Sequence, residues 1–205
     1  MAFFILWACS AEAQPAEDAA SRVADRAARA AHLRASGQRL FDAGDLGSAA
    51  GYFRDAISAD PADAHAYEML ARVYLRQNAT SHALEVLRAG LARRADHAPL
   101  WRTLSEVFVA QGQTDEAADA LRELVARAPT DIAAHVMRAQ LAAQRHAFCE
   151  ALDSYRAIMD LAPPGDPRNQ EARRFASALV LLVGSVDPVV GAHRMDSPVR
   201  AALSQ

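Results

Sequence analysis

The fold is decided by residues 98–131, which read APLWRTLSEVFVAQGQTDEAADALRELVARAPTD. Apolar residues recur at helical spacing on both sides of Gly112, and glycine tolerates the left-handed backbone that ends a helix. Pro129 ends the second apolar run, because proline disfavours helical geometry in the residue before it. The stretch therefore predicts two helices that pack against each other across a tight turn.

The same pattern recurs along the chain at a constant period, which is the spacing from Ala83 to Ala117. Columns of residues in one register share a property: small, turn-forming, helix-stopping or bulky. They are Ala49, Ala83, Ala117 and Ala151; Gly44, Asn78, Gly112 and His146; Pro61, Ala95, Pro129 and Pro163; Phe53, Leu87, Leu121 and Tyr155; and Leu33, Tyr67, Trp101 and His135. Several independent columns in one register indicate an array of helical-hairpin repeats.

Over about residues 30–163 the pattern resembles the tetratricopeptide-repeat (TPR) family. The third unit matches best, through Trp101, Leu104, Phe108, Gly112, Ala117, Leu121 and Pro129. The resemblance implies an all-α fold: a right-handed α-solenoid of four TPR helix-turn-helix units with a C-terminal capping helix. The expected units are residues 30–63, 64–97, 98–131 and 132–165. In the fourth unit His135, Arg138 and Ala142 replace apolar residues, so its first helix is expected to pack less well or against something specific.

Polar flanks are expected at both ends, because a repeat array leaves apolar faces at its ends. Residues 15–29 are expected to form a linker and an N-terminal extension of the first helix. A capping helix is expected over residues 166–184, with Asp166 as N-cap and Pro167 as its first residue. Its apolar run from residue 178 to 183 should cover the end of the stack or contact a partner. Residues 185–205 form a tail in which Ser197 and Pro198 favour a short last helix.

Residues 1–14 are similar to a secretory signal. Their apolar stretch is too short to span a bilayer, and no basic residue precedes it. Two interpretations stay open: cleavage after Ala13, or lipidation of Cys9 in a segment that resembles a bacterial lipoprotein box. Either one predicts a periplasmic or envelope-anchored protein, and a cytoplasmic location is the alternative. A membrane contact is expected only through such an anchor.

Composition and motifs exclude several classes of function. The net charge is −3 and no basic stripe occurs, which argues against nucleic-acid binding. His146, Cys149 and Glu150 share one helical face, but no fourth zinc ligand lies nearby in the sequence. We therefore expect no catalytic residues, no metal site and no cofactor.

In TPR arrays the first helices line a concave face that usually holds the ligand, so the resemblance implies a protein or peptide partner. The lining would mix charged and apolar groups, which suits a peptide with one or two apolar anchors. Glu68 and Arg72 also have the i, i+4 order that favours an ion pair within one helix. The candidate groove residues are Arg34, Gln38, Phe41, His65, Glu68, Arg72, Leu75, Arg76, Arg102, Glu106, Val109, Val136 and Gln140.

One subfamily of TPR domains grips the C-terminal carboxylate of chaperones with a clamp of Lys, Asn and Arg. The corresponding positions here hold Arg34, Gln38, Met69, Pro99 and Thr103, and only the first two are similar. A chaperone-tail adaptor is therefore not predicted.

The sequence favours a non-catalytic scaffold or adaptor in a bacterial cell-envelope complex. The alternative is a cytosolic regulatory subunit or scaffold, and a remote alternative is an enzyme with a site in residues 183–205. The oligomeric state and the identity of the partner stay open.

Overall fold

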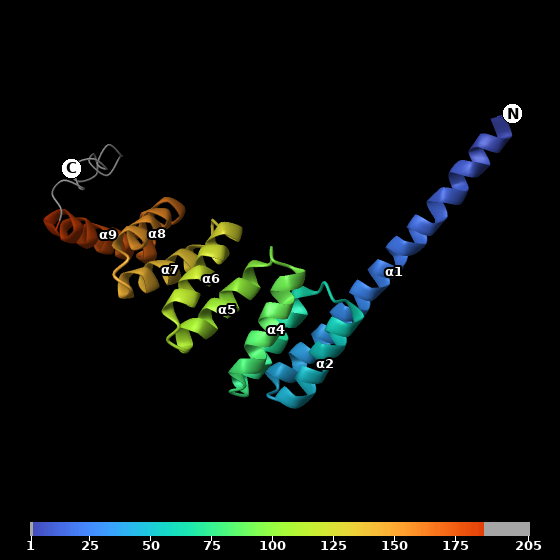
Figure 1. The fold of residues 1–205 in the computed structure, drawn as a ribbon, viewed down its shortest axis with the longest axis horizontal. Coiled ribbons are helices and arrows are strands. Elements are labelled where there is room, and N and C mark those ends of the chain that lie inside the picture. The colour runs from blue at the N-terminus through green and yellow to red at the C-terminus, as the bar shows by residue number, and fades with distance from the viewer. Residues whose placement is uncertain (1, 187–205) are drawn as a thin grey trace. The chain divides into compact units, whose positions relative to one another are not determined.

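The computed structural model describes the backbone of residues 2–186 and the side chains of residues 19–181. Within that part every regular secondary-structure element is an α-helix (Figure 1), which confirms the all-α expectation. The helices are α1 (Ala2–Asp42), α2 (Leu46–Ala59), α3 (Ala64–Arg76), α4 (Thr80–Arg93), α5 (Ala98–Ala110), α6 (Thr114–Arg127), α7 (Ile132–Gln144), α8 (Phe148–Leu161) and α9 (Pro167–Val186). They fall into two compact units, Met1–Val107 and Phe108–Gln205.

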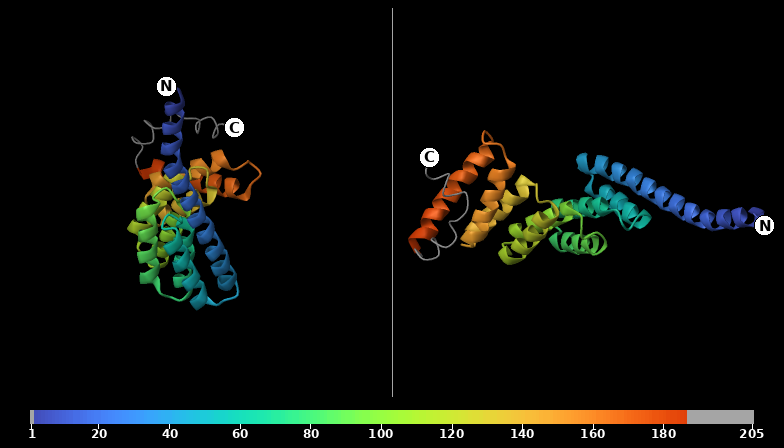
Figure 2. Two further views of the ribbon diagram at one scale, coloured as in Figure 1. Left: turned by 90° about the vertical axis from the view of Figure 1, so that its right-hand side faces the viewer. Right: turned by 90° about the horizontal axis from the view of Figure 1, so that it is seen from above.

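Successive helices pack against each other within each unit. In the first unit α1 contacts α2, α2 contacts α3 and α3 contacts α4; in the second, α6 contacts α7, α7 contacts α8 and α8 contacts α9. The N-terminal half of α1 extends beyond α2 (Figure 2), and its side chains are exposed from residue 19 to 29. The first buried residue of α1 is Ala30, at the start of the predicted repeats. Among the helices whose side chains are described, none is long and apolar enough to cross a membrane.

The four turn residues predicted from the repeat all adopt the left-handed conformation. Gly44 and Gly112 have φ of 85° and 72°, and Asn78 and His146 have φ of 58° and 57°. His146 therefore serves the turn before α8, where its ring meets Phe148 edge-on at 5.7 Å between centroids. Glycine and asparagine tolerate this conformation best, which explains why the column is so restricted.

Alternation of small and bulky side chains forms the interior of each unit. The alanines of the small column are fully buried, as are Phe53, Leu87 and Leu121, while Tyr155 is 7% exposed. Glycines allow the closest approaches. A Cβ added to Gly37 would lie 3.0 Å from the Phe53 ring, and a Cβ on Gly90 would lie 2.8 Å from the Cβ of Tyr67.

The first helix of the fourth repeat packs through a specific contact. Tyr67 and Trp101 each donate a hydrogen bond to the carbonyl six residues earlier, at 3.4 and 2.8 Å. His135 occupies the next position of that column, is 6% exposed, and places Nε2 at 2.9 Å from the Pro129 carbonyl oxygen. The substitution of His for an aromatic residue thus keeps the hydrogen bond of the other repeats.

Helix α9 begins at Pro167, directly after Asp166, as expected. It is held in place by Asn169, which is fully buried. The Asn169 Nδ2 group donates to the carbonyls of Met159 at 2.9 Å and Ala162 at 2.7 Å, both near the end of α8. These two bonds satisfy carbonyls that the end of α8 would otherwise leave unpaired.

Candidate functional site

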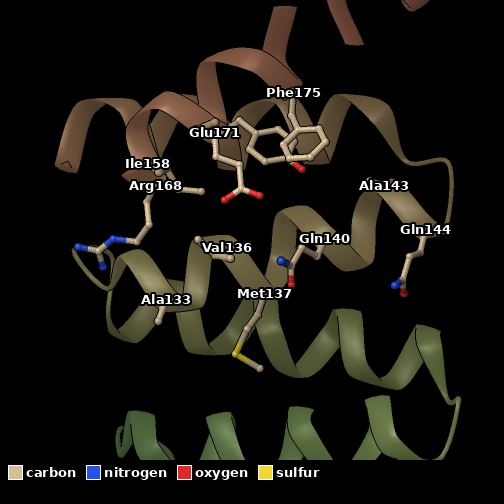
Figure 3. Close-up of a pocket in the computed structure, with 12 residues that line it drawn as sticks. Ala133, Val136, Met137, Gln140, Ala143, Gln144, Ile158, Arg168, Glu171 and Phe175 are labelled. Atoms are coloured by element: carbon tan, nitrogen blue, oxygen red, sulfur yellow. The ribbon is translucent and has the colours of Figure 1, made fainter. Parts of the chain in front are cut away.

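A groove of about 480 Å³ lies in the second unit, among α7, α8 and α9 (Figure 3). Helix α7 forms one wall, α8 contributes Tyr155 and Ile158, and α9 forms the other wall. Its volume falls in the range of small-molecule and side-chain pockets. The lining residues are Ala133, Val136, Met137, Gln140, Ala143, Gln144, Tyr155, Ile158, Arg168, Glu171, Ala172 and Phe175.

The lining of the groove is mainly apolar. Phe175 stacks on Tyr155 with ring centroids 5.6 Å apart and planes 18° apart, yet Phe175 stays 47% exposed. Burial and, second, the negative charge of Glu171 raise the pKa of Tyr155, so its phenol is neutral at physiological pH. An exposed aromatic ring on an apolar floor is a typical anchor site for a partner side chain.

The two charged residues of the groove differ in their pairing. Arg168 makes two hydrogen bonds to Asp166, Nε–Oδ1 at 3.0 Å and Nη2–Oδ2 at 2.6 Å. This contact raises the pKa of Arg168 and lowers that of Asp166. Glu171 forms no ion pair with any described side chain, and its carboxylate points from α9 towards α7 (Figure 3). The groove therefore carries an apolar lining and one available negative charge.

The candidate groove residues of the fourth repeat, Val136 and Gln140, both line this groove. The sequence placed them on the first helix of that repeat, and α7 presents them on the wall opposite α9. Whether they bind a partner stays a prediction.

In the first unit most candidate groove residues contact other side chains of the same chain. The Arg76 guanidinium lies 4.5 Å from the centre of the Phe41 ring and donates to the Phe41 carbonyl at 3.2 Å. Gln38 donates to Asp42 at 2.8 Å. Leu75 is half-buried.

An ion pair joins α1 to the start of α3 in the first unit. Arg34 pairs with Asp63 at 2.5 Å, and Asp63 also accepts the backbone N–H of Ala66 at 3.3 Å as the N-cap of α3. Of the remaining candidates, Arg102 is half-buried and Glu106 exposed in the first unit, while Val109, in the second, is 46% exposed.

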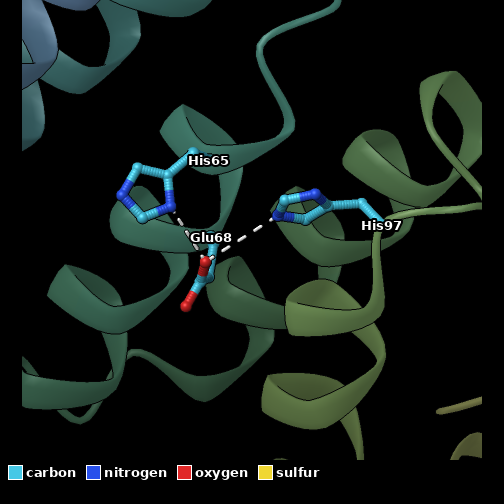
Figure 4. A group of neighbouring side chains, drawn as sticks. All are labelled: His65, Glu68 and His97. Atoms are coloured by element: carbon cyan, nitrogen blue, oxygen red, sulfur yellow. Dashed lines mark hydrogen bonds and ion pairs between the residues drawn. The ribbon is translucent and has the colours of Figure 1, made fainter. Parts of the chain in front are cut away.

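Glu68 is the most buried of the candidate groove residues, with its side chain 6% exposed. It pairs with Arg72 at 3.1 Å, which confirms the ion pair expected from their spacing, and with His65 Nδ1 at 3.1 Å (Figure 4). Burial opposes its ionisation, but the hydrogen bond from His65 and the positive charges around it outweigh burial and lower its pKa. A partner would meet His65 and Arg72 before this carboxylate.

Sequence reasoning missed the half of the groove that belongs to α9. It treated the segment as a cap and assigned no role to Phe175 or Glu171. The signal was present, because Ala172, Ala176 and Leu179 lie at helical spacing and pack on the core beneath Tyr155. Phe175 neighbours that stripe, so the spacing would have indicated a side chain at the edge of the packed face.

The predictions of lipidation and cleavage concern Cys9 and Ala13, whose side chains lie outside the described residues, as does the tail after residue 186. They stay predictions. Cys149 is a free, exposed cysteine.

Comparison with known proteins identifies the repeats. A family model described as "Tetratricopeptide repeat" matches residues 40–107 and 80–141. A search of curated protein sequences finds no match. Among solved structures, a crystal structure of MamA aligns with 72% of this chain and 84% of its own at 17% identity and a TM-score of 0.59.

Two further structures share the fold. YrrB, described as a TPR protein with an unusual peptide-binding site, has 19% identity, a TM-score of 0.56, and coverage of 77% of this chain and 86% of its own. The first TPR domain of Spaghetti (RPAP3), bound to the HSP90 peptide SRMEEVD, has 16% identity, a TM-score of 0.55, and coverage of 58% and 98%. At such identities the similarity shows a common fold.

Paired helices, turn residues and register define a helical-repeat protein. The chain is a tetratricopeptide-repeat protein, and the matched repeats extend over residues 40–141.

Proposed function

We propose that this protein is a non-catalytic scaffold that binds a peptide or protein segment, with the groove among α7, α8 and α9 as its docking site. The observation that carries the proposal is Phe175, an aromatic ring that stacks on Tyr155 and stays half-exposed over an apolar floor. The family supports it, since TPR proteins are generally non-catalytic scaffolds, and two of the structural neighbours are described with a bound peptide or a peptide-binding site.

The charge of the groove indicates the chemistry of the ligand. Glu171 is available, whereas Arg168 is already paired with Asp166. We infer a segment with a bulky apolar residue, to fill the space beside Phe175 and Met137, next to a Lys or Arg that pairs with Glu171. The first unit is the weaker candidate, because its charges largely pair with one another.

Selection of peptides from a displayed random library on the full chain tests the proposal. Recovered peptides should combine a bulky apolar residue with a neighbouring basic one, and their affinity is measured by fluorescence polarisation. Glu171→Arg and Phe175→Ala should each weaken binding by about tenfold or more, as for central interface anchors. Arg174→Glu is the matched control, because this exposed residue of α9 does not line the groove.

The opposite result would place the docking site elsewhere. Binding that survives Glu171→Arg and Phe175→Ala but is lost in Arg72→Glu would contradict the groove of the second unit and favour the face formed by α1 and α3. A role in an envelope complex is a further expectation from residues 1–14. Palmitate labelling with Cys9→Ala as control tests it. If no label depends on Cys9, the hypothesis of a lipid anchor is refuted.

A further inference from the structure

Three metal-binding side chains meet in the first unit, apart from the groove of the second. His65 and Glu68 lie one turn apart on α3, and His97 directly precedes α5 (Figure 4). One ligand atom from each lies within 4.8 Å of the other two. His65 Nδ1 is 3.1 Å and His97 Nε2 4.0 Å from Glu68 Oε2.

His97 occupies a position where the neighbouring repeats carry a helix cap. Asp63 and Asp131 lie one period before and one period after it, and both accept backbone N–H groups at the starts of α3 and α7. Imidazole is a poor substitute for such a cap. Instead, His97 Nε2 is buried and has no hydrogen-bond partner, since 4.0 Å to Glu68 is too long for one. The residue at this position therefore serves something other than the helix end.

Glu68, the residue that faces His97, also differs from its equivalent in the repeat before. One repeat earlier, Arg34 pairs with the capping Asp63. At the equivalent positions of the next repeat the chain has Glu68 and His97, so a cation–anion pair is replaced by a carboxylate and an imidazole. Carboxylate and imidazole are both metal ligands, and His65, one turn before Glu68 on the same face of α3, supplies a third.

We propose that His65, Glu68 and His97 bind a Zn²⁺ ion, which would join α3 to the start of α5. Tetrahedral zinc with bonds of about 2.0–2.2 Å places its donors roughly 3.3 Å apart. The His65–Glu68 distance already fits, and the others close through rotation of the two partly exposed imidazoles. Three protein ligands leave one position for water or for a ligand from a partner. Two nitrogen donors disfavour Ca²⁺ and Mg²⁺, which prefer oxygen.

Arg72 opposes the ion, because its guanidinium holds Glu68 Oε1 at 3.1 Å and adds positive charge. Removal of this contact should therefore strengthen zinc binding, whereas substitution of a ligand should weaken it. Arg72→Gln should bind zinc more tightly than the unaltered chain, whereas a cluster with no metal function would only lose an ion pair.

Isothermal titration of ZnCl₂ into the full chain tests the site, with the protein free of a histidine tag and stripped by a chelator. We expect one zinc per chain, confirmed by elemental analysis. His65→Asn, His97→Asn and Glu68→Gln should each weaken binding at least as much as the roughly 10–100-fold typical of outer-shell partners. His97→Asn is the safest variant for folding, because Asn is a good N-cap.

His32→Asn is the matched control, since this exposed histidine of α1 lies outside the cluster. Zinc should raise the melting temperature of the unaltered chain and of His32→Asn, but not of His97→Asn. The proposal is overturned if the chain binds no zinc at micromolar concentrations, or if His97→Asn binds it as tightly as the unaltered chain. Equal weakening by His32→Asn would likewise assign the zinc to scattered surface histidines.

Discussion

Substitution of Gly90 by alanine tests the packing of α3 against α4. Gly90 is buried within α4, and a Cβ there would lie 2.8 Å from the Cβ of Tyr67 and 3.1 Å from Cδ1 of Leu100. Leu100 can adopt another rotamer, but the Tyr67 Cβ is fixed to the backbone of α3. The Tyr67 hydroxyl also contacts the Pro61 carbonyl at 3.4 Å, which restrains the ring.

Two effects of opposite sign determine the result. Alanine is favoured over glycine in a helix by about 1 kcal/mol. An added methyl group in a packed interior costs about 1–3 kcal/mol, and a contact to an immobile atom lies towards the upper end of that range. We therefore expect Gly90→Ala to lower the free energy of unfolding by about 1–2 kcal/mol.

Gly51 provides the matched control inside α2. A Cβ added there meets nothing within 4 Å, so Gly51→Ala should keep the propensity gain and raise stability by about 0.5–1 kcal/mol. Urea unfolding followed by circular dichroism measures both, with the slopes compared to check cooperativity. If Gly90→Ala raises the free energy of unfolding as much as Gly51→Ala does, α3 and α4 do not approach as closely as described.

Three further predictions concern buried polar groups. Asn169→Ala removes the hydrogen bonds to two carbonyls at the end of α8, so it should cost about 2–3 kcal/mol and speed hydrogen exchange in α9; unchanged exchange would contradict its role in holding that helix. Asp63→Ala removes the cap of α3 and the partner of Arg34 and should cost about 1–2 kcal/mol in urea unfolding, whereas a neutral result would mean that water replaces the cap. Burial lowers the pKa of His97 from its ordinary 6.5, so below that pH the unfolded chain takes up a proton that the folded chain does not. Stability should therefore fall as the pH drops from 6.5 towards the folded pKa, and it should fall less in His97→Asn. If the urea midpoint changes equally in the two proteins between about pH 7.5 and about pH 5.5, this prediction is refuted.

The sequence predicts the local geometry of each repeat well, because that geometry depends on residues within one period. The four turn residues are an example, since a positive φ restricts the side chain directly. The fully buried alanines and the bulky column follow from helical spacing alone. His135 makes the same hydrogen bond as Tyr67 and Trp101 in its column, although a histidine there suggested looser packing.

The candidate sites depend on contacts that the period does not encode. The groove needs α9, which follows the last repeat and has no earlier copy from which to infer its packed face. The histidine–glutamate cluster needs the end of one repeat beside the first helix of the same repeat, so most of a repeat separates Glu68 from His97 along the chain. A mismatch within the Asp63, His97, Asp131 column is the one sequence signal of that cluster.

If the groove binds a partner as proposed, the attachment of α9 also sets its effective affinity. Helices at the end of a repeat array open most readily, and α9 supplies Phe175 and Glu171. Only molecules with α9 in place are competent to bind, so the apparent dissociation constant is the intrinsic one divided by that fraction. A ligand that bridges α7 and α9 would in turn slow hydrogen exchange along α9. The proposed site thus makes docking of the terminal helix and binding of a partner linked equilibria, and a change at Asn169, which holds α9 to the end of α8, would act on both.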